Sequence, residues 1–500
     1  MAEEEKCGIL NTHSACVRTL LKEKRKMKGI SKVVFLLCLT LILALSMASC
    51  NESQDAPNTF EGESTSCEET TEPPFLEGES TICEETTEPH FHLYGIWKVI
   101  KEPTLNDEGI KERTCSECGH RKEETIPPLA SQGLAYEINE DGKTCTITGR
   151  GTCTDGILKF PSIIDGYRVT SIGEEAFYYD SGKISSIVIP EGIECIEEDA
   201  FGGCFFLSNV QLPNSLLSIG DYAFDSCTDL VSIELPENLE NLGKGAFDAC
   251  YGLETVNIPK GITQIGDCTF RECRALTEIA LHDGITFIGH SAFYDCSSLK
   301  SVTIPNGVTE ILISTFASCD ALQTVRLPDT LKSIGNNAFA DCFFLTDIML
   351  PNGLESIGDG AFDECYRLKN VTIPNSVTHI GSDAFAACGA VQIVNEVCYV
   401  GDWAVGLYDD DLSVYTLQEG TVGVADCLFS YGIYLKNVTI PESIKYVGRN
   451  AFFQCIDLNQ IVFGGTKEQW DAIEKHPDWD ITTRSYTVHC TDGEIEVQNQ

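Results

Sequence analysis

Residues 219–236 have the sequence IGDYAFDSCTDLVSIELP. Close copies begin at Leu242 (LGKGAFDACYGLETVNIP), Ile288 (IGHSAFYDCSSLKSVTIP) and Ile357 (IGDGAFDECYRLKNVTIP). From Ile219 to Ile380 the start of the unit recurs at a step of 23 residues. Twelve units can be recognised, and they begin at Ile172, Ile196, Ile219, Leu242, Ile265, Ile288, Ile311, Ile334, Ile357, Ile380, Val424 and Val447. A fixed period in the twenties predicts a solenoid, in which each unit buries its apolar face against its neighbours.

Each unit contains one segment with the pattern of a strand. In L-x-x-V-x-I-P apolar and polar residues alternate, which predicts a short half-buried strand that ends at the proline. In the unit that begins at Leu242, this strand would carry Val256 and Ile258. The segment x-x-A-F-x-x-C fits one helical turn, with Ala246 and Phe247 between coils. Stacked coils are therefore expected to form an α/β solenoid with one parallel sheet on one face.

A cysteine occupies the same place in ten units: Cys204, Cys227, Cys250, Cys273, Cys296, Cys319, Cys342, Cys365, Cys388 and Cys455. We expect these cysteines to be buried free thiols that donate weakly to backbone carbonyls. Disulfides between neighbouring coils would break a uniform ladder into pairs and strain every second coil. Because exported cysteines are usually paired, free thiols imply an anaerobic or reducing habitat.

The pattern I-G-x-x-A-F-x-x-C-x-x-L-x-x-V-x-I-P resembles the BspA-like leucine-rich repeat family. The resemblance covers roughly residues 134–490. It implies a leucine-rich repeat solenoid on a bacterial surface protein, and adhesion to macromolecules of a host or a neighbouring cell. In leucine-rich repeats generally, an inward Asn or Cys that stacks with its counterparts occupies the place of the cysteine.

The ends of a solenoid need covers. We expect an N-terminal cap at 131–171, repeats at 172–463 with an irregular stretch at 395–423, and a C-terminal cap at 464–500. Alternating residues in the first cap predict a hairpin. In the second cap Thr466 begins a capping-box sequence that predicts a helix carrying Trp470, and the strand SYTVHC closes the chain.

The only long apolar run is VVFLLCLTLILALSMAS, residues 33–49. Its length is marginal for a membrane span and typical of the core of a signal peptide. Cys50 follows in the context M-A-S-C, which resembles a bacterial lipoprotein signal; the resemblance implies that Cys50 is acylated and that residues 1–49 are removed. If Met27 is the true start, the signal has ordinary length. The alternative is an uncleaved anchor, and both place the rest of the chain outside the membrane.

Two further segments precede the caps. Residues 50–89 contain two copies of an acidic unit rich in Thr, Glu and Pro, without Lys or Arg, which predicts an extended tether. Residues 90–130 resemble a short Cys-containing module of bacterial surface proteins, through H-x-Y-G-x-W, T-C, C-x-x-C-G and I-P. A zinc site of Cys115 and Cys118 with some of His90, His92 and His120 is one interpretation. The alternative is a structural or disulfide pair, and no other cofactor is expected.

The charge balance excludes several classes of partner. The chain has 34 Lys and Arg against 76 Asp and Glu, a formal net charge of −42. A nucleic-acid partner is not expected, because phosphate binding needs clustered Lys and Arg. Docking on anionic lipid is excluded in the same way, so the membrane would be contacted only through the lipid anchor.

No enzyme motif appears: H-E-x-x-H, G-x-S-x-G and a phosphate-binding glycine loop are missing from the sequence. We therefore expect no catalytic residue. Asp409, Asp410 and Asp411 suggest either a calcium site or a solvated turn, and the turn is favoured because the run lacks an EF-hand pattern.

The outward positions of the predicted strands form a polar, non-repeating surface. Five of them are candidate contacts for a large partner: Asn257, Thr303, Arg326, Met349 and Thr372. Bulky residues that follow the cysteines form either a second, aromatic strip or packing across adjacent turns: Phe205, Phe206, Tyr251, Phe343, Phe344 and Tyr366.

Two functions remain possible from the sequence. The first is a monomeric, lipid-anchored cell-surface module that binds a host or neighbouring-cell protein or other macromolecule. The second is a structural or carbohydrate-associated surface component with no protein receptor. A glycan binder should carry Trp or Tyr in line on the outward strand positions, and none occurs there. The first function is therefore preferred.

Overall fold

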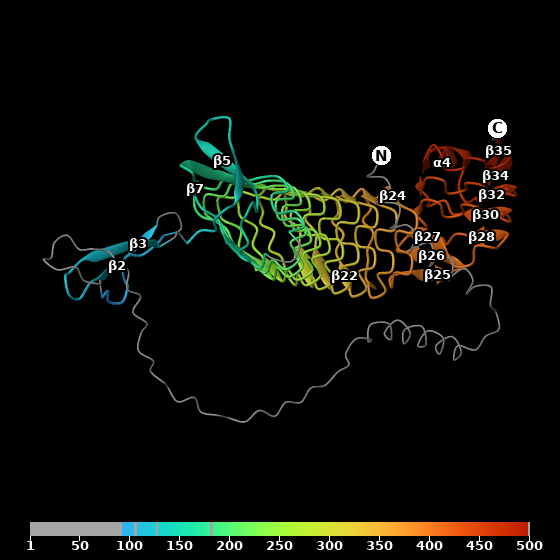
Figure 1. The fold of residues 1–500 in the computed structure, drawn as a ribbon. Coiled ribbons are helices and arrows are strands. Elements are labelled where there is room, and N and C mark those ends of the chain that lie inside the picture. The colour runs from blue at the N-terminus through green and yellow to red at the C-terminus, as the bar shows by residue number, and fades with distance from the viewer. Residues whose placement is uncertain (1–92, 105–107, 127–128, 181–183, 499–500) are drawn as a thin grey trace, which may run out of the picture. The chain divides into compact units, whose positions relative to one another are not determined.

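The computed structural model describes residues 93–104, 108–126, 129–180 and 184–498. The predicted signal peptide, Cys50 and the tether lie outside the described residues, as do His90 and His92. The repeats form a solenoid of stacked coils of about 23 residues (Figure 1). The residues that the sequence places inward are buried: in one coil, Ala246, Phe247, Cys250 and Leu253 are each 0% exposed.

The solenoid carries two parallel ladders of strands, one on each long side; Figure 1 labels β22 on one side and β24 on the other. The first ladder, which we call the glycine side, consists of two-residue strands that end in front of the Ile-Gly glycine. Each strand pairs with the strand one coil further, as Ser218 does with Asn241 and Ile219 with Leu242.

The glycine-side strands are β8 (Tyr167–Ile172), β10 (Cys195–Ile196), β12 (Ser218–Ile219), β14 (Asn241–Leu242), β16 (Gln264–Ile265), β17 (Phe287–Ile288), β19 (Glu310–Ile311), β21 (Ser333–Ile334), β23 (Ser356–Ile357), β24 (His379–Ile380), β29 (Gly423–Val424), β31 (Tyr446–Val447) and β33 (Glu474–Lys475). Apart from β8 they have two residues, too few to show an alternation of apolar and polar residues, and most of the repeat strands bury one side chain.

The second ladder, the proline side, is the one that L-x-x-V-x-I-P predicts. Its central residues are buried and their neighbours exposed, as in the run Ser301, Val302 and Thr303. The proline-side strands are β6 (Ile157–Lys159), β9 (Ser186–Val188), β11 (Asn209–Gln211), β13 (Ser232–Ile233), β15 (Thr255–Val256), β18 (Ser301–Thr303), β20 (Thr324–Arg326), β22 (Asp347–Ile348), β28 (Val414–Thr416), β30 (Asn437–Ile440), β32 (Gln460–Phe463) and β34 (Tyr486–Cys490).

The segment A-F-x-x-C differs from the predicted helical turn. Asp225 N donates to Tyr222 O at 2.9 Å and Cys227 N to Phe224 O at 3.2 Å, so the segment is a series of tight turns. Tyr222 and Ser226 have left-handed backbone angles, with φ of 53° and 58°. The alternate N–H groups point along the solenoid: Phe224 N donates to Ala246 O of the next coil at 2.9 Å. This turn side therefore adds a third set of bonds between coils.

Consequently, two details of the predicted α/β architecture are wrong. Parallel strands line two sides of the solenoid and not one, and the repeats contain no α-helix among the described residues. The only α-helix there is α4 (Lys467–Asp471) in the C-terminal cap.

Columns of identical side chains fill the interior. Ten phenylalanines, one per coil from Phe177 to Phe385, stack with ring centroids 5.2–5.7 Å apart. Their spacing follows from neighbouring strands, which lie about 4.8 Å apart and place each ring over its counterpart.

The ten cysteines named above form the adjoining column, and each is 0–6% exposed. In nine of them Sγ donates to a phenylalanine carbonyl of the preceding coil at 3.0–3.5 Å. Cys388 donates instead to Leu368 O at 3.6 Å. Burial raises the pKa of all ten thiols, to about 12 for Cys204 and Cys455. Because the thiolate is the reactive form, these thiols are chemically inert in the folded chain.

The first coil ends the cysteine column. Asp180 occupies the place that a cysteine has in later units, and its carboxylate accepts from Nε of Arg150 in the N-terminal cap. The same guanidinium donates to Asp155 O at 2.8 Å. The cap itself is a hairpin of β4 (Ala135–Ile138) and β5 (Thr144–Gly149), which extends the glycine-side sheet next to β8, and β7 (Ile163–Ile164) pairs with β8.

At the other end, Thr466 caps α4 by a capping box with Gln469, and Trp470 is buried. The strand SYTVHC corresponds to β34, but a further strand, β35 (Gly493–Val497), follows it and pairs with it antiparallel. Trp470 packs edge-on against Phe463, with ring centroids 5.3 Å apart.

The irregular stretch 395–423 interrupts the coils with antiparallel strands β25 (Gln392–Val394), β26 (Val397–Val400) and β27 (Trp403–Leu407). β27 pairs in parallel with β29, so the insert adds a strand to the glycine side. The Trp403 ring lies over Gly423, where a Cβ atom would be 2.4 Å from a ring carbon; only glycine fits. The buried residues of the solenoid divide into two clusters at this insert, which contributes side chains to both.

A small antiparallel sheet precedes the solenoid and consists of β1 (Lys98–Lys101), β2 (Gly109–Thr114) and β3 (Arg121–Ile126). It has little core of its own, and Ile96 is 84% exposed. Cation–π contacts hold Trp97, whose ring centroid lies 4.8 Å from Lys111 Nζ and 4.6 Å from the Arg113 guanidinium.

The state of the cysteine column can be measured. A thiol reagent should count few thiols in the native full chain and about thirteen more after unfolding without reductant, because the ten column cysteines and Cys115, Cys145 and Cys153 are buried. An unchanged count would mean that the column is joined by disulfides.

Because the cysteine column is tightly packed, a larger side chain within it should destabilise the folded chain. Cys296→Leu should lower the free energy of unfolding by about 1–3 kcal/mol, because it overpacks two coil interfaces. Lys300→Leu, at an exposed position of the same coil, is the control and should change little in the same chemical denaturation experiment.

Candidate binding surface

The candidate contacts lie on the proline side, and all five are exposed. Thr303 of β18 pairs in register with Arg326 of β20, and Met349 occupies the same place one coil further, directly after β22. Met349 is 87% exposed, the most exposed large hydrophobic residue of the described chain. The strands therefore bring a hydroxyl, a guanidinium and a thioether side by side across three coils.

Arg326 has no carboxylate within salt-bridge distance among the described residues. Asp347, in the next coil, accepts from Asn370 Nδ2 at 3.1 Å. The guanidinium is thus an exposed cation on an acidic chain, which leaves it open to a partner. Arginine is enriched among the residues that dominate binding energy at interfaces.

Asn257 is exposed but already engaged. Its Nδ2 donates to Leu235 O at 2.8 Å, and its Oδ1 accepts from Leu235 N at 2.7 Å. The side-chain amide therefore satisfies both backbone groups of a residue in the preceding coil, where β13 has already ended. Sequence pattern alone gave no signal for this role, because a polar residue is expected at any outward strand position.

The bulky residues after the cysteines lie on the turn side and combine exposure with contacts between coils. Phe206 and Tyr366 are more than half exposed, and Phe205, Tyr251 and Phe344 are about two-fifths exposed. Phe343 stacks on Tyr366, with ring centroids 5.7 Å apart. Both interpretations of the sequence are thus partly met: these rings pack across coils and still present open faces.

Carboxylates accompany these rings. Burial, followed by repulsion from Glu364 in the next coil, raises the pKa of Asp341 to about 6. Burial and repulsion from Asp248 likewise raise the pKa of Asp225 to about 6. Asp248 itself is held by Arg271, whose guanidinium makes two contacts of 2.6 and 2.8 Å with it.

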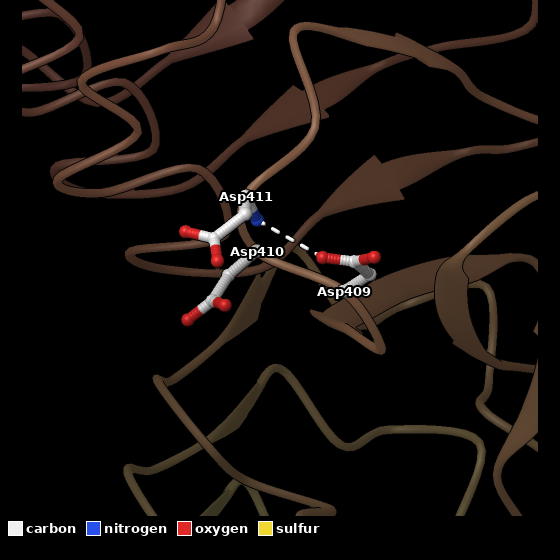
Figure 2. Close-up of side chains that lie close together, drawn as sticks. All are labelled: Asp409, Asp410 and Asp411. Carbon is white, nitrogen blue, oxygen red and sulfur yellow. Dashed lines mark hydrogen bonds between the residues drawn. The ribbon is translucent and has the colours of Figure 1, made fainter. Parts of the chain in front are cut away.

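Asp409, Asp410 and Asp411 form the only group of three potential metal ligands among the described residues. Figure 2 shows them on one turn, where Asp411 N donates to Asp409 Oδ1 at 3.2 Å. Asp410 and Asp411 are exposed, and the Asp409 carbonyl accepts from the Tyr415 hydroxyl. This geometry is that of a solvated turn, and nothing further points to a cation.

In the small sheet, Cys115 and Cys118 lie on the turn between β2 and β3, where Cys115 is buried and its N–H donates to His120 O at 2.8 Å. Of the histidines that could complete a zinc site, His120 is exposed, and His90 and His92 lie outside the described residues. The zinc site stays a prediction. Within the part of the chain that the structure describes, no helix is long and apolar enough to cross a membrane.

Comparison with known proteins gives a family match. A family described as "BspA type Leucine rich repeat region (6 copies)" matches residues 170–300, 264–392 and 407–472, which together make up more than half of the chain. No curated protein matched.

Several solved structures are similar to the chain. A leucine rich cell surface protein of Faecalibacterium prausnitzii A2-165 is 25% identical with a TM-score of 0.36, over 70% of this chain and 98% of that chain. A leucine-rich repeat protein of T. pallidum is 27% identical with a TM-score of 0.34, over 44% and 91%. One from Bacteroides ovatus is 22% identical with a TM-score of 0.42, over 72% and 99%.

The amide of Asn257 makes a testable contribution to stability. Asn257→Ala should lower the free energy of unfolding by about 1–2 kcal/mol, because two backbone groups lose their partner. Thr303→Ala is the control at an equally exposed strand position and should lie close to wild type in the same denaturant titration. Equal stability of both variants would contradict a structural role for the amide.

Proposed function

The chain belongs to the BspA-type leucine-rich repeat family, and we propose that it is a non-catalytic bacterial cell-surface protein whose solenoid binds a macromolecule. The observation that carries the proposal is the exposed row of Thr303, Arg326 and Met349 across three coils. A rigid array holds such groups at fixed spacing, so binding a large partner costs little ordering.

The chemistry of the row favours a protein partner over a glycan. A thioether adapts to irregular apolar surfaces, and a guanidinium forms paired hydrogen bonds with carboxylates. The outward strand positions carry no line of Trp or Tyr on which sugar rings would stack. The partner we propose is a protein or other macromolecule of a host or neighbouring cell.

The row can be tested with the full chain on beads. Wild type should retain a partner from the surface of host or neighbouring cells, and Thr303→Ala, Arg326→Ala and Met349→Ala together should weaken binding roughly tenfold or more. The thermal melt should stay unchanged, since all three side chains are exposed.

A matched control lies on the opposite ladder. Thr309→Ala, Lys332→Ala and Glu355→Ala change three exposed residues in consecutive coils, including one cation, and should leave binding intact. If the partner is retained by residues 90–129 alone, the solenoid is a spacer and the proposal is overturned.

The proposed localisation rests on Cys50. Cys50 should carry lipid, because the preceding segment has the form of a lipoprotein signal. Metabolic labelling with a palmitate analogue should mark wild type and Cys67→Ala but not Cys50→Ala. Equal labelling of Cys50→Ala would contradict the anchor.

A further inference from the structure

Arg274, on the turn side, is held by residues of three successive coils, and its contacts can be compared with the same positions in other coils. The Arg274 guanidinium lies 4.6 Å from the centroid of the Tyr251 ring in the preceding coil. It donates to Glu272 of its own coil at 2.7 Å and to Asp295 of the next coil at 2.9 Å. A ring face and two carboxylates from successive coils thus form a complete receptor for a guanidinium within the chain itself.

Three coils further on, the two carboxylates recur at the same places. Asp341 corresponds to Glu272 and Glu364 to Asp295, whereas Phe343 stands where Arg274 stands and Asp320 stands where Tyr251 stands. The local backbone is the same: Glu272, Asp341 and Glu364 have φ of 58–60°. In both coils the N–H of the residue after the cysteine donates to the carbonyl two residues earlier, at 2.8 Å for Arg274 and 2.9 Å for Phe343.

The second place therefore holds the carboxylates without an arginine between them. No salt bridge to Asp341 or Glu364 is found among the described residues, and the Arg367 guanidinium lies 4.1 Å from the centroid of the Phe344 ring. Two stacked rings, Phe343 and Tyr366, border the pair, and Tyr366 is 52% exposed. Burial raises the pKa of Asp341, and repulsion from Glu364 and a hydrogen bond with it raise that pKa further.

We propose that Asp341 and Glu364, together with the ring faces of Phe343 and Tyr366, bind an arginine side chain of an extended polypeptide partner. The charge is complementary, and Arg274 shows that two carboxylates at these places, with an aromatic ring nearby, can hold a guanidinium. Arginine suits the site better than lysine, because its planar guanidinium stacks on a ring while it bonds two carboxylates. The site lies on the turn side and does not depend on the row of Thr303, Arg326 and Met349.

The probe for the test is a fluorescein-labelled peptide of four Arg-Gly-Ser units, and fluorescence polarisation with the full chain at pH 7.5 and near-physiological salt reports its binding. Asp341→Asn with Glu364→Gln should weaken binding roughly tenfold, as expected for loss of charge-assisted contacts. Glu240→Gln with Glu310→Gln removes the same charge at exposed glycine-side positions and should leave affinity within about twofold.

Two further measurements separate a specific site from general attraction to an acidic protein. Arg274→Ala vacates the receptor formed by Tyr251, Glu272 and Asp295, so the number of peptides bound should rise from one to two. Binding by wild type should weaken as pH falls through about 6, where Asp341 takes up a proton.

Failure of the arginine site and failure of the proposed binding row give different results. The variant with Thr303, Arg326 and Met349 replaced should bind the peptide normally, whatever happens to its surface partner. Equal losses in the Asp341–Glu364 variant and the glycine-side control would overturn the inference, as would unchanged stoichiometry in Arg274→Ala. A lysine peptide of the same design that binds as tightly would contradict the role of the rings.

Discussion

The hydrogen bond from one coil to the same place in the next is the interaction on which the rest of the structure depends. It is formed on three sides of the coil, by the strands of the glycine side, the strands of the proline side and the tight turns. Because it fixes the rise between coils at about 4.8 Å, every side chain lies over its counterpart in the neighbouring unit. Inside the solenoid this constraint favours repetition, since a flat ring stacks well on an identical ring and a small thiol fits each turn in the same way.

Outside the solenoid the same constraint works against repetition, because a repeated charge would lie over a like charge. The repulsion between like charges is offset by hydrogen bonds that carboxylates accept from the neighbouring coil. Asp221 accepts from Lys244 N at 2.8 Å and Asp267 from His290 N at 2.7 Å, so these carboxylates are held by backbone donors. Asp248 is held by Arg271 in a similar way. Asp341 and Glu364 lack such a cation, and that difference within an otherwise regular surface is what distinguishes their coils.

The period of the sequence was sufficient to predict the solenoid and its inward residues, because Phe247, Cys250 and Ile265 recur at one spacing. Local patterns, such as the capping-box sequence at Thr466, were sufficient to predict the helix of the C-terminal cap. The second ladder was missed because a two-residue strand such as Ser218–Ile219 buries one side chain and shows no alternation. The turns were mistaken for a helix because left-handed residues such as Tyr222 and Ser226 are not marked by glycine.

The engaged amide of Asn257 depends on where a strand of the preceding coil ends, which one unit does not reveal. The Arg274 receptor was within reach, since Tyr251 and Arg274 are one period apart.

The ion pair between Asp180 and Arg150 has a consequence for how such a chain can change in length. A coil duplicated between two existing coils keeps every column continuous, with ring on ring and thiol on thiol. A coil added in front of the first would separate Asp180 from Arg150 and enclose a carboxylate without its cation. The solenoid can therefore gain coils by duplication within the array but not in front of its first coil. Related chains should differ in the number of internal coils and share the same first coil.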